Sequence, residues 1–142
     1  MTLLAFLLAL GVLITVHEWG HYRVAVACGV KVLTFSIGFG QPLLRWKSRR
    51  PHAGQDTEFC ISLIPLGGYV KMLDENEAEV APQDVVMAFN RQPLWARAAI
   101  VSAGPLANLL LAVCLYAATF WIGQYETQAT LSAPVVGSVA EA

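Results

Sequence analysis

The sequence predicts a mainly α-helical membrane protein, with two transmembrane helices and, between them, a membrane-associated β-hairpin or reentrant loop. Of the 142 residues, 56% are hydrophobic and only 13% are charged, and the mean hydropathy is +0.56. This composition is typical of a membrane protein rather than of a soluble domain. Two long uncharged stretches lie toward the two ends of the chain, and a segment of alternating hydrophobicity lies between them. We therefore expect one membrane-embedded unit over residues 1–125 and a separate tail over residues 126–142.

The first transmembrane helix is expected over residues 2–27. No charged residue precedes Glu18, and the run before His17 is apolar. A membrane-spanning helix needs about 20 residues at about 1.5 Å each, so this run is too short to cross by itself. The span closes only if residues 17–21 are part of it, which places them at membrane depth.

The segment His17-Glu18-Trp19-Gly20-His21 has the H-E-x-x-H pattern. On a helix the two histidines lie one turn apart on the same face, so both imidazoles can reach one metal ion, with Glu18 beside them. Zinc held in this way lowers the pKa of a bound water to about 7, and the glutamate can move the water's proton to a leaving amine. The pattern also occurs by chance on ordinary helices, but ionisable side chains inside a membrane are costly and mark functional sites. We therefore predict that His17 and His21 bind Zn²⁺ and that Glu18 is the catalytic base of a peptide hydrolysis.

A strand is predicted over residues 33–39, because apolar and other side chains alternate there. Gln41-Pro42 is expected to end it, and a polar loop follows over residues 45–56. A second strand is expected over residues 57–64, ending at Pro65, with a turn or bulge at Gly67-Gly68. The two strands would pair as a hairpin within residues 30–70. The strand over residues 33–39 would offer an exposed edge to which an extended substrate could add.

The second transmembrane helix is expected over residues 98–124, which contain no charge, after a polar loop over residues 71–97. Within that loop, residues 82–91 are expected to form a short amphipathic helix with Val85, Val86 and Phe89 facing inward. Asn108 places an amide inside the second span, where it needs a partner. Helix packing alone and service to the active site are both open interpretations of this residue.

The distribution of basic residues predicts the orientation in the lipid bilayer. All nine Lys and Arg residues lie between Arg23 and Arg97. Short loops rich in Lys and Arg stay cytoplasmic, so we expect the middle of the chain to face the cytoplasm and both termini to face outward. The net charge of −1 and the lack of a basic stripe argue against nucleic acid as a partner.

Several motifs together resemble one family. The chain resembles the N-terminal part of a bacterial site-2 protease of the regulator of sigma-E type, an intramembrane zinc metalloprotease. The resemblance rests on His-Glu-Trp-Gly-His-Tyr (17–22), Phe-Ser-Ile-Gly-Phe-Gly (35–40), Ile-Pro-Leu-Gly-Gly-Tyr-Val-Lys-Met-Leu-Asp (64–74), Ala-Phe-Asn-Arg (88–91) and Ala-Gly-Pro-Leu-Ala-Asn (103–108). These motifs occur in the family's order and span almost the whole chain.

The resemblance implies that His17 and His21 bind zinc and that Glu18 is the base. It also implies that Gly38, Phe39 and Gly40 belong to a membrane-reentrant β-loop that binds substrate. Asn108 would lie near the same site and is assigned to substrate binding as well. The implied substrates are single-span membrane proteins of the anti-sigma factor or remnant signal peptide type, and the implied location is the bacterial inner membrane with both termini periplasmic. Residues 134–137 resemble the start of the family's first PDZ domain.

One part of the family pattern is missing from this sequence. The third zinc ligand of the family is an aspartate in a Leu-Asp-Gly motif on a later membrane helix, and no Leu-Asp-Gly occurs here. We therefore expect the 142-residue chain alone not to cleave peptides efficiently. The alternative interpretation is a non-catalytic membrane module that keeps a substrate-binding surface.

Overall fold

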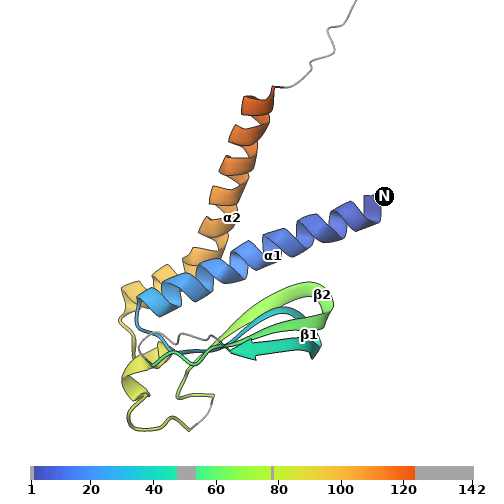
Figure 1. Ribbon diagram of the computed structural model, residues 1–142. Helices are drawn as coiled ribbons and strands as arrows, with labels where there is room; N and C mark the ends of the chain where they lie inside the picture. The colour runs from blue at the N-terminus through green and yellow to red at the C-terminus, as the bar shows by residue number, and fades with distance from the viewer. Residues whose placement is uncertain (1, 48–53, 78, 124–142) are drawn as a thin grey trace, which may run out of the picture.

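The computed structural model describes residues 2–47, 54–77 and 79–123. The elements in order are helix α1 (Thr2–Ala27), strands β1 (Val32–Lys47) and β2 (Glu58–Met72), the 3-10 turns η1 (Val85–Met87) and η2 (Phe89–Arg91), and helix α2 (Leu94–Ile122). The two helices meet at one end and diverge toward the other, and the sheet lies along α1 (Figure 1). The segment between β2 and α2 lies at the end where the helices meet.

Helix α1 has the bounds predicted from the sequence. It ends because the chain reverses at Gly29, whose φ of 78° is in the left-handed region that glycine adopts without strain. The amide of Gly29 donates to Val26 O at 3.1 Å and that of Cys28 to Val24 O at 2.9 Å, which satisfies two of the last carbonyls of the helix. Both α1 and α2 are long and apolar enough to cross a membrane by length and composition.

The sheet consists of two antiparallel strands, each of which bends so strongly that it contributes two segments. Residues 34–37 pair with residues 68–71 on one side and with residues 58–61 on the other, and residues 42–47 pair with the 58–62 segment. The segment predicted to expose an edge, residues 33–39, is therefore covered on both sides, and that prediction is wrong. Within the described part of the chain, the outer segments are residues 42–47 and residues 68–72.

Both strands run through the residues that were predicted to end them. Strand β1 continues through Gln41-Pro42, and β2 continues through Pro65 and the Gly67-Gly68 pair. Gly38 and Gly40, with φ values of 89° and 84°, turn β1 sharply without ending its pairing. Pro42 lies on an outer segment, where a missing amide hydrogen is tolerated.

The core joins the end of α1, the start of β1 and the first turns of α2. Ala25, Val30, Val32 and Ile100 are all at most 1% exposed. Gln55 attaches the loop after β1 to this core: its Nε2 donates to Val30 O at 2.7 Å and its Oε1 accepts from Val32 N at 3.0 Å. The loop predicted as simply polar is therefore partly buried and bonded to the start of β1.

The amphipathic helix predicted over residues 82–91 does not form, and two 3-10 turns replace it. The backbone here bonds to the strand ends instead: Lys31 N donates to Met87 O at 2.9 Å, and Phe89 N donates to Leu73 O at 2.7 Å. These bonds hold the segment against the sheet and compete with a regular helix. Val86, predicted to face inward, is 78% exposed.

Helix α2 begins at Leu94, four residues before the predicted start, because Pro93 with φ of −60° precedes its first turn. It ends at Ile122, where Gly123 turns the chain with φ of 80°. The predicted tail and the predicted PDZ start at residues 134–137 lie outside the described residues.

Candidate active site

The site is built where α1 crosses α2. Gly20 lies against α2 so closely that a Cβ there would be 2.5 Å from Ala103 O and 2.8 Å from Ala107 Cβ. Small residues on both helices allow this approach. The crossing brings His17 and His21 against the face of α2 that carries Gly104.

The two imidazoles converge on one point. His17 Nε2 and His21 Nε2 lie 3.2 Å apart. Two nitrogens bound tetrahedrally to one zinc at about 2.0–2.1 Å would be separated by about 3.3–3.4 Å. His21 Nδ1 donates to Ile100 O at 2.7 Å, because a carbonyl can only accept. His21 Nε2 therefore carries a lone pair, as a metal ligand oriented by a carbonyl does.

Gly104 leaves the space that such a metal needs. A Cβ at this position would lie 2.7 Å from His17 Nε2 and closer still to His21 Nε2. The spacing of the two nitrogens and the absence of a side chain at Gly104 fit a zinc ion. Within residues 2–47, 54–77 and 79–123, no group of three His, Cys, Asp or Glu side chains could hold a metal. Within this part of the chain, His17 and His21 thus remain the two candidate ligands.

Glu18 is half-buried and faces the edge of the sheet. Its Cγ would be 2.9 Å from a Cβ at Gly68, so the absence of a side chain at Gly68 makes room for it. A cavity of about 400 Å³ opens between α1, α2 and β2, and His17, Glu18, Phe39 and Asn108 contribute to its lining. The predicted catalytic base therefore lies next to a predicted ligand and to open space.

Of the four residues predicted to bind substrate, two line this cavity and two do not. Gly38 is buried at the corner of β1, where a Cβ would be 2.9 Å from Ser62 O and from Ile64 O, and Gly40 lies beside the Ile64 side chain. Phe39 lines the cavity and stacks on Tyr69, with ring centroids 6.3 Å apart. Asn108 lines the same cavity, and its Nδ2 lies 3.3 Å from His17 Nδ1.

Comparison with known proteins identifies the family of this chain. The model of peptidase family M50 matches residues 5–140. The chain belongs to peptidase family M50. It is 51% identical over 138 residues to protease RseP of Yersinia pestis and 50% identical over 137 residues to the regulator of sigma-E protease RseP of Salmonella typhimurium. These alignments cover 97% and 96% of this chain and 28% of each relative.

A third relative, from Ralstonia nicotianae, is named as a zinc metalloprotease and is 49% identical over 146 aligned positions, which cover 99% of this chain and 31% of that protein. The chain thus spans about 30% of the length of these M50 relatives. The resemblance to a site-2 protease of the regulator of sigma-E type is confirmed.

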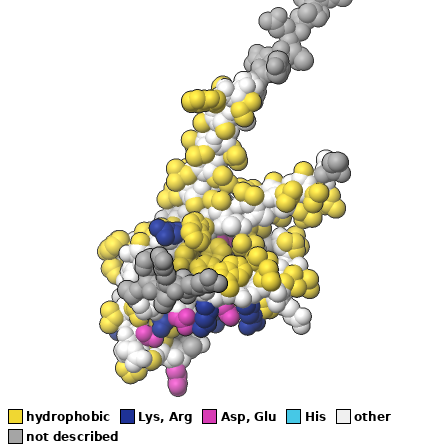
Figure 2. Space-filling view, viewed as in Figure 1, with side chains coloured by type: hydrophobic (Ala, Val, Ile, Leu, Met, Phe, Trp, Pro, Cys, Tyr) yellow, Lys and Arg dark blue, Asp and Glu magenta, His cyan; other side chains and the backbone are white. Residues whose placement is uncertain are grey.

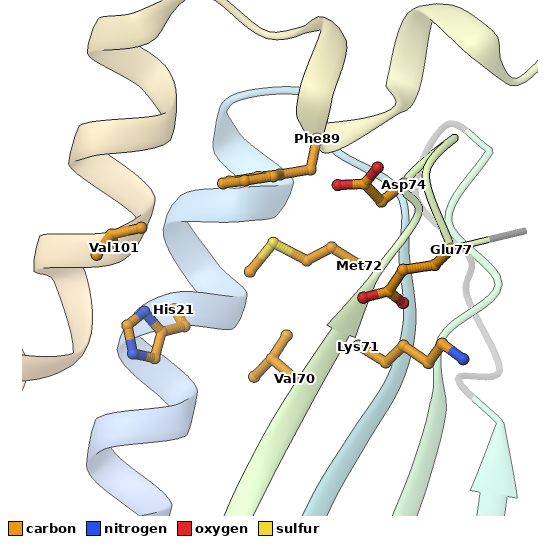
Figure 3. Close-up of a pocket in the computed structure, with 8 residues that line it drawn as sticks. All are labelled: His21, Val70, Lys71, Met72, Asp74, Glu77, Phe89 and Val101. Carbon is orange, nitrogen blue, oxygen red and sulfur yellow. The ribbon is translucent and has the colours of Figure 1, made fainter.

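A second cavity, of about 390 Å³, opens beside His21 (Figure 3). Figure 3 shows His21 on α1 and Val101 on α2 opposite Val70 and Met72 of β2, with Phe89 closing one end. Residues 66–68 line the first cavity and residues 70–72 line the second. The outer segment of β2 thus runs from the cavity lined by His17 and Glu18 to the cavity lined by His21.

Sequence reasoning missed this segment. Residues 65–72 looked like the end of a strand followed by a turn, because Pro65 and the Gly67-Gly68 pair are breakers. The signal that could have identified them is the same glycine pair, interpreted as room for neighbouring side chains. A Cβ at Gly67 would meet the Phe39 ring, and one at Gly68 would meet Glu18.

Proposed function

We propose that this chain forms the zinc-binding, N-terminal part of an intramembrane metalloendopeptidase that cleaves single-span membrane proteins of the anti-sigma factor or remnant signal peptide type. The observation that carries the proposal is the convergence of His17 Nε2 and His21 Nε2, 3.2 Å apart, on the space at Gly104, with Glu18 beside them. The names of the relatives, zinc metalloprotease and regulator of sigma-E protease, support it.

The proposal places α1 and α2 across the bacterial inner membrane. Hydrophobic side chains cover both helices, and the charged side chains visible in Figure 2 gather at the end where the sheet and the loop lie. Because all Lys and Arg residues lie between Arg23 and Arg97, this end would face the cytoplasm and both termini the periplasm. Residues 1–125 would form the membrane-embedded unit and residues 126–142 an outward tail that begins a PDZ domain.

The chemistry follows from the positions of the side chains. A zinc ion held by His17 and His21 would supply a Lewis acid that polarises the scissile carbonyl and acidifies a water. Glu18 takes the proton of the attacking water and delivers it to the departing amine. The apolar helices around the site limit access of bulk water, which strengthens these electrostatic interactions.

Residues 66–72 of β2 would hold the substrate. A peptide bond is attacked in an extended chain, and an extended chain can add to the free edge of a sheet through backbone hydrogen bonds. This edge passes from the cavity beside Glu18 to the cavity beside His21. The substrate edge is thus proposed at residues 66–72 in place of residues 33–39, which the sequence predicted. Phe39 would still line the cavity that receives the substrate.

Adjacent proline variants test the edge. Amide hydrogens alternate between the two sides of a strand, so of Tyr69→Pro and Val70→Pro one removes a bond to β1 and the other removes a donor at the free edge. The variant altered at the free edge should stay folded and keep zinc but lose cleavage. Full turnover in both folded variants would exclude this edge as the substrate site.

The catalytic role is tested in a chimera, with this chain joined to the remaining part of the Salmonella relative. The chimera should cleave a single-span substrate, and Glu18→Gln should abolish cleavage and leave zinc bound. His17→Ala should lose both zinc and activity, because it removes a ligand. A chimera that binds the substrate and zinc without cleavage would contradict the proposal and favour a non-catalytic substrate-binding module.

A further inference from the structure

Asn108 contacts His17 at Nδ1, the ring nitrogen that does not face His21. Its side chain lies on α2, one turn after Gly104, with Nδ2 3.3 Å from His17 Nδ1. Its Oδ1 is buried and has no hydrogen-bond partner among the described residues. The polar groups of a buried amide are normally hydrogen-bonded, and in this arrangement one acceptor is not.

The orientation of this amide decides the tautomer of His17. If Nδ2 donates to His17 Nδ1, the imidazole must carry its hydrogen on Nε2, which then points at the lone pair of His21 Nε2. That arrangement is a hydrogen bond between two histidines and leaves His17 no lone pair for a metal. The two ends of an amide differ little in shape, so a half-turn places Oδ1 against His17 Nδ1 instead. Oδ1 then accepts from Nδ1, and the lone pair moves to Nε2.

We propose that Asn108 is a positioning residue that accepts a hydrogen bond from His17 Nδ1 and so holds His17 Nε2 ready for zinc. The inference rests on the proposed role of His17 as a metal ligand. It gives α2 two equivalent groups on one face: Ile100 O holds His21, Asn108 Oδ1 holds His17, and Gly104 between them leaves the metal its space. It differs from the sequence prediction that Asn108 binds substrate.

The tautomer of His17 can be measured without metal. Nitrogen NMR of the ¹⁵N-histidine-labelled chain in detergent, at a pH where the imidazoles are neutral, distinguishes protonated from unprotonated ring nitrogens. The wild-type chain should show His17 protonated at Nδ1. Asn108→Leu removes the acceptor at similar size and should shift the hydrogen toward Nε2. Asn108→Asp supplies a carboxylate oxygen and should restore Nδ1 protonation.

Zinc affinity gives a second readout in the same chain. Groups that orient a metal-bound histidine contribute about 10–100-fold to metal affinity, so Asn108→Leu should weaken zinc binding by that factor and Asn108→Asp should recover it. The control is Ser102→Ala on an exposed part of α2, where the hydroxyl bonds only to Ala98 O and Ala99 O among the described residues. It should change neither readout.

Three results would overturn the inference: His17 protonated at Nε2 in the wild-type chain, unchanged zinc affinity in folded Asn108→Leu, or no recovery in Asn108→Asp. If Asn108→Leu does not fold, the wild-type tautomer and Asn108→Asp still decide. Failure of the proposed function would give a different result. His17→Ala would then bind zinc with the affinity of the wild-type chain, and the tautomer of His17 would still test the role of Asn108.

Discussion

The substitution Gly104→Ala tests the space beside the two imidazoles that is proposed for the metal. The added methyl carbon would lie 2.7 Å from His17 Nε2 and closer to His21 Nε2, whereas carbon and nitrogen in contact need about 3.5 Å. Either α2 or the imidazoles must move by about 0.8 Å or more. A misplacement of about 1 Å can cost about 100-fold in a positioned site. We expect zinc affinity to fall by about 10–100-fold, or about 1.4–2.8 kcal/mol.

The assay is competition for zinc against a chromophoric chelator in detergent, with helix content measured by circular dichroism. Helix content should stay unchanged, because alanine favours helices more than glycine does. Gly11→Ala is the matched control: it is also a glycine of a long helix, and among the described residues nothing lies within 4 Å of its Cβ position. Wild-type zinc affinity in a folded Gly104→Ala chain would refute the assignment of this space to the metal.

Three further predictions concern the parts that support the site. Gly38→Ala should destabilise the fold by about 1–3 kcal/mol through strain at φ of 89° and contact with Ser62 O and Ile64 O. Gly40 has a similar φ but only the Ile64 side chain nearby, so Gly40→Ala should lose less stability in denaturant titrations. An equal loss of stability in the two variants would contradict the steric reasoning. Gln55→Leu should lower the free energy of unfolding by about 1–3 kcal/mol for each buried backbone group left unpaired at Val30 and Val32. Gln83→Leu on the exposed loop should leave the stability unchanged. Equal stabilities of the two variants would refute the role of Gln55. Hydrogen bonds from Arg91 and Asn90 lower the pKa of Glu75, so the stabilisation by this contact is present above the ordinary carboxyl pKa and is lost as the pH falls through the lowered value. Glu75→Gln should therefore unfold more easily than the wild-type chain at neutral pH and equally at strongly acidic pH, and a difference that persists in acid would contradict this origin.

The features predicted correctly depend on residues that are close together in the sequence. The apolar run becomes long enough to cross a membrane only when residues 17–21 are included, and this predicts the bounds that α1 has in the structure. Spacing on a helix predicts that the imidazoles of His17 and His21 lie together, and they do. The roles of these two residues and of Glu18 stay predictions. The second helix was predicted in the right place, but its start was predicted four residues too late. The absence of charge predicts a start at residue 98, whereas Pro93 sets the start at Leu94.

The parts predicted wrongly depend on contacts between distant residues. The glycines at 67 and 68 look like a turn locally, but they accommodate Phe39 and Glu18 within a continuous strand. The edge offered to substrate could not be chosen from the sequence, because the covering of residues 33–39 by two segments of β2 depends on pairings across the chain. The position of Gly104 against the imidazoles of His17 and His21 likewise depends on the crossing of α1 and α2.

The proposed function depends most directly on two imidazoles that bind one zinc ion. X-ray absorption at the zinc edge, recorded on the purified 142-residue chain loaded with one equivalent of zinc, measures the ligands and their distances. We expect two imidazole nitrogens at about 2.0–2.1 Å from the zinc, with the remaining positions filled by light atoms, and loss of one imidazole in His21→Ala. Zinc coordinated by sulfur, or a spectrum that His21→Ala leaves unchanged, would contradict the proposed function.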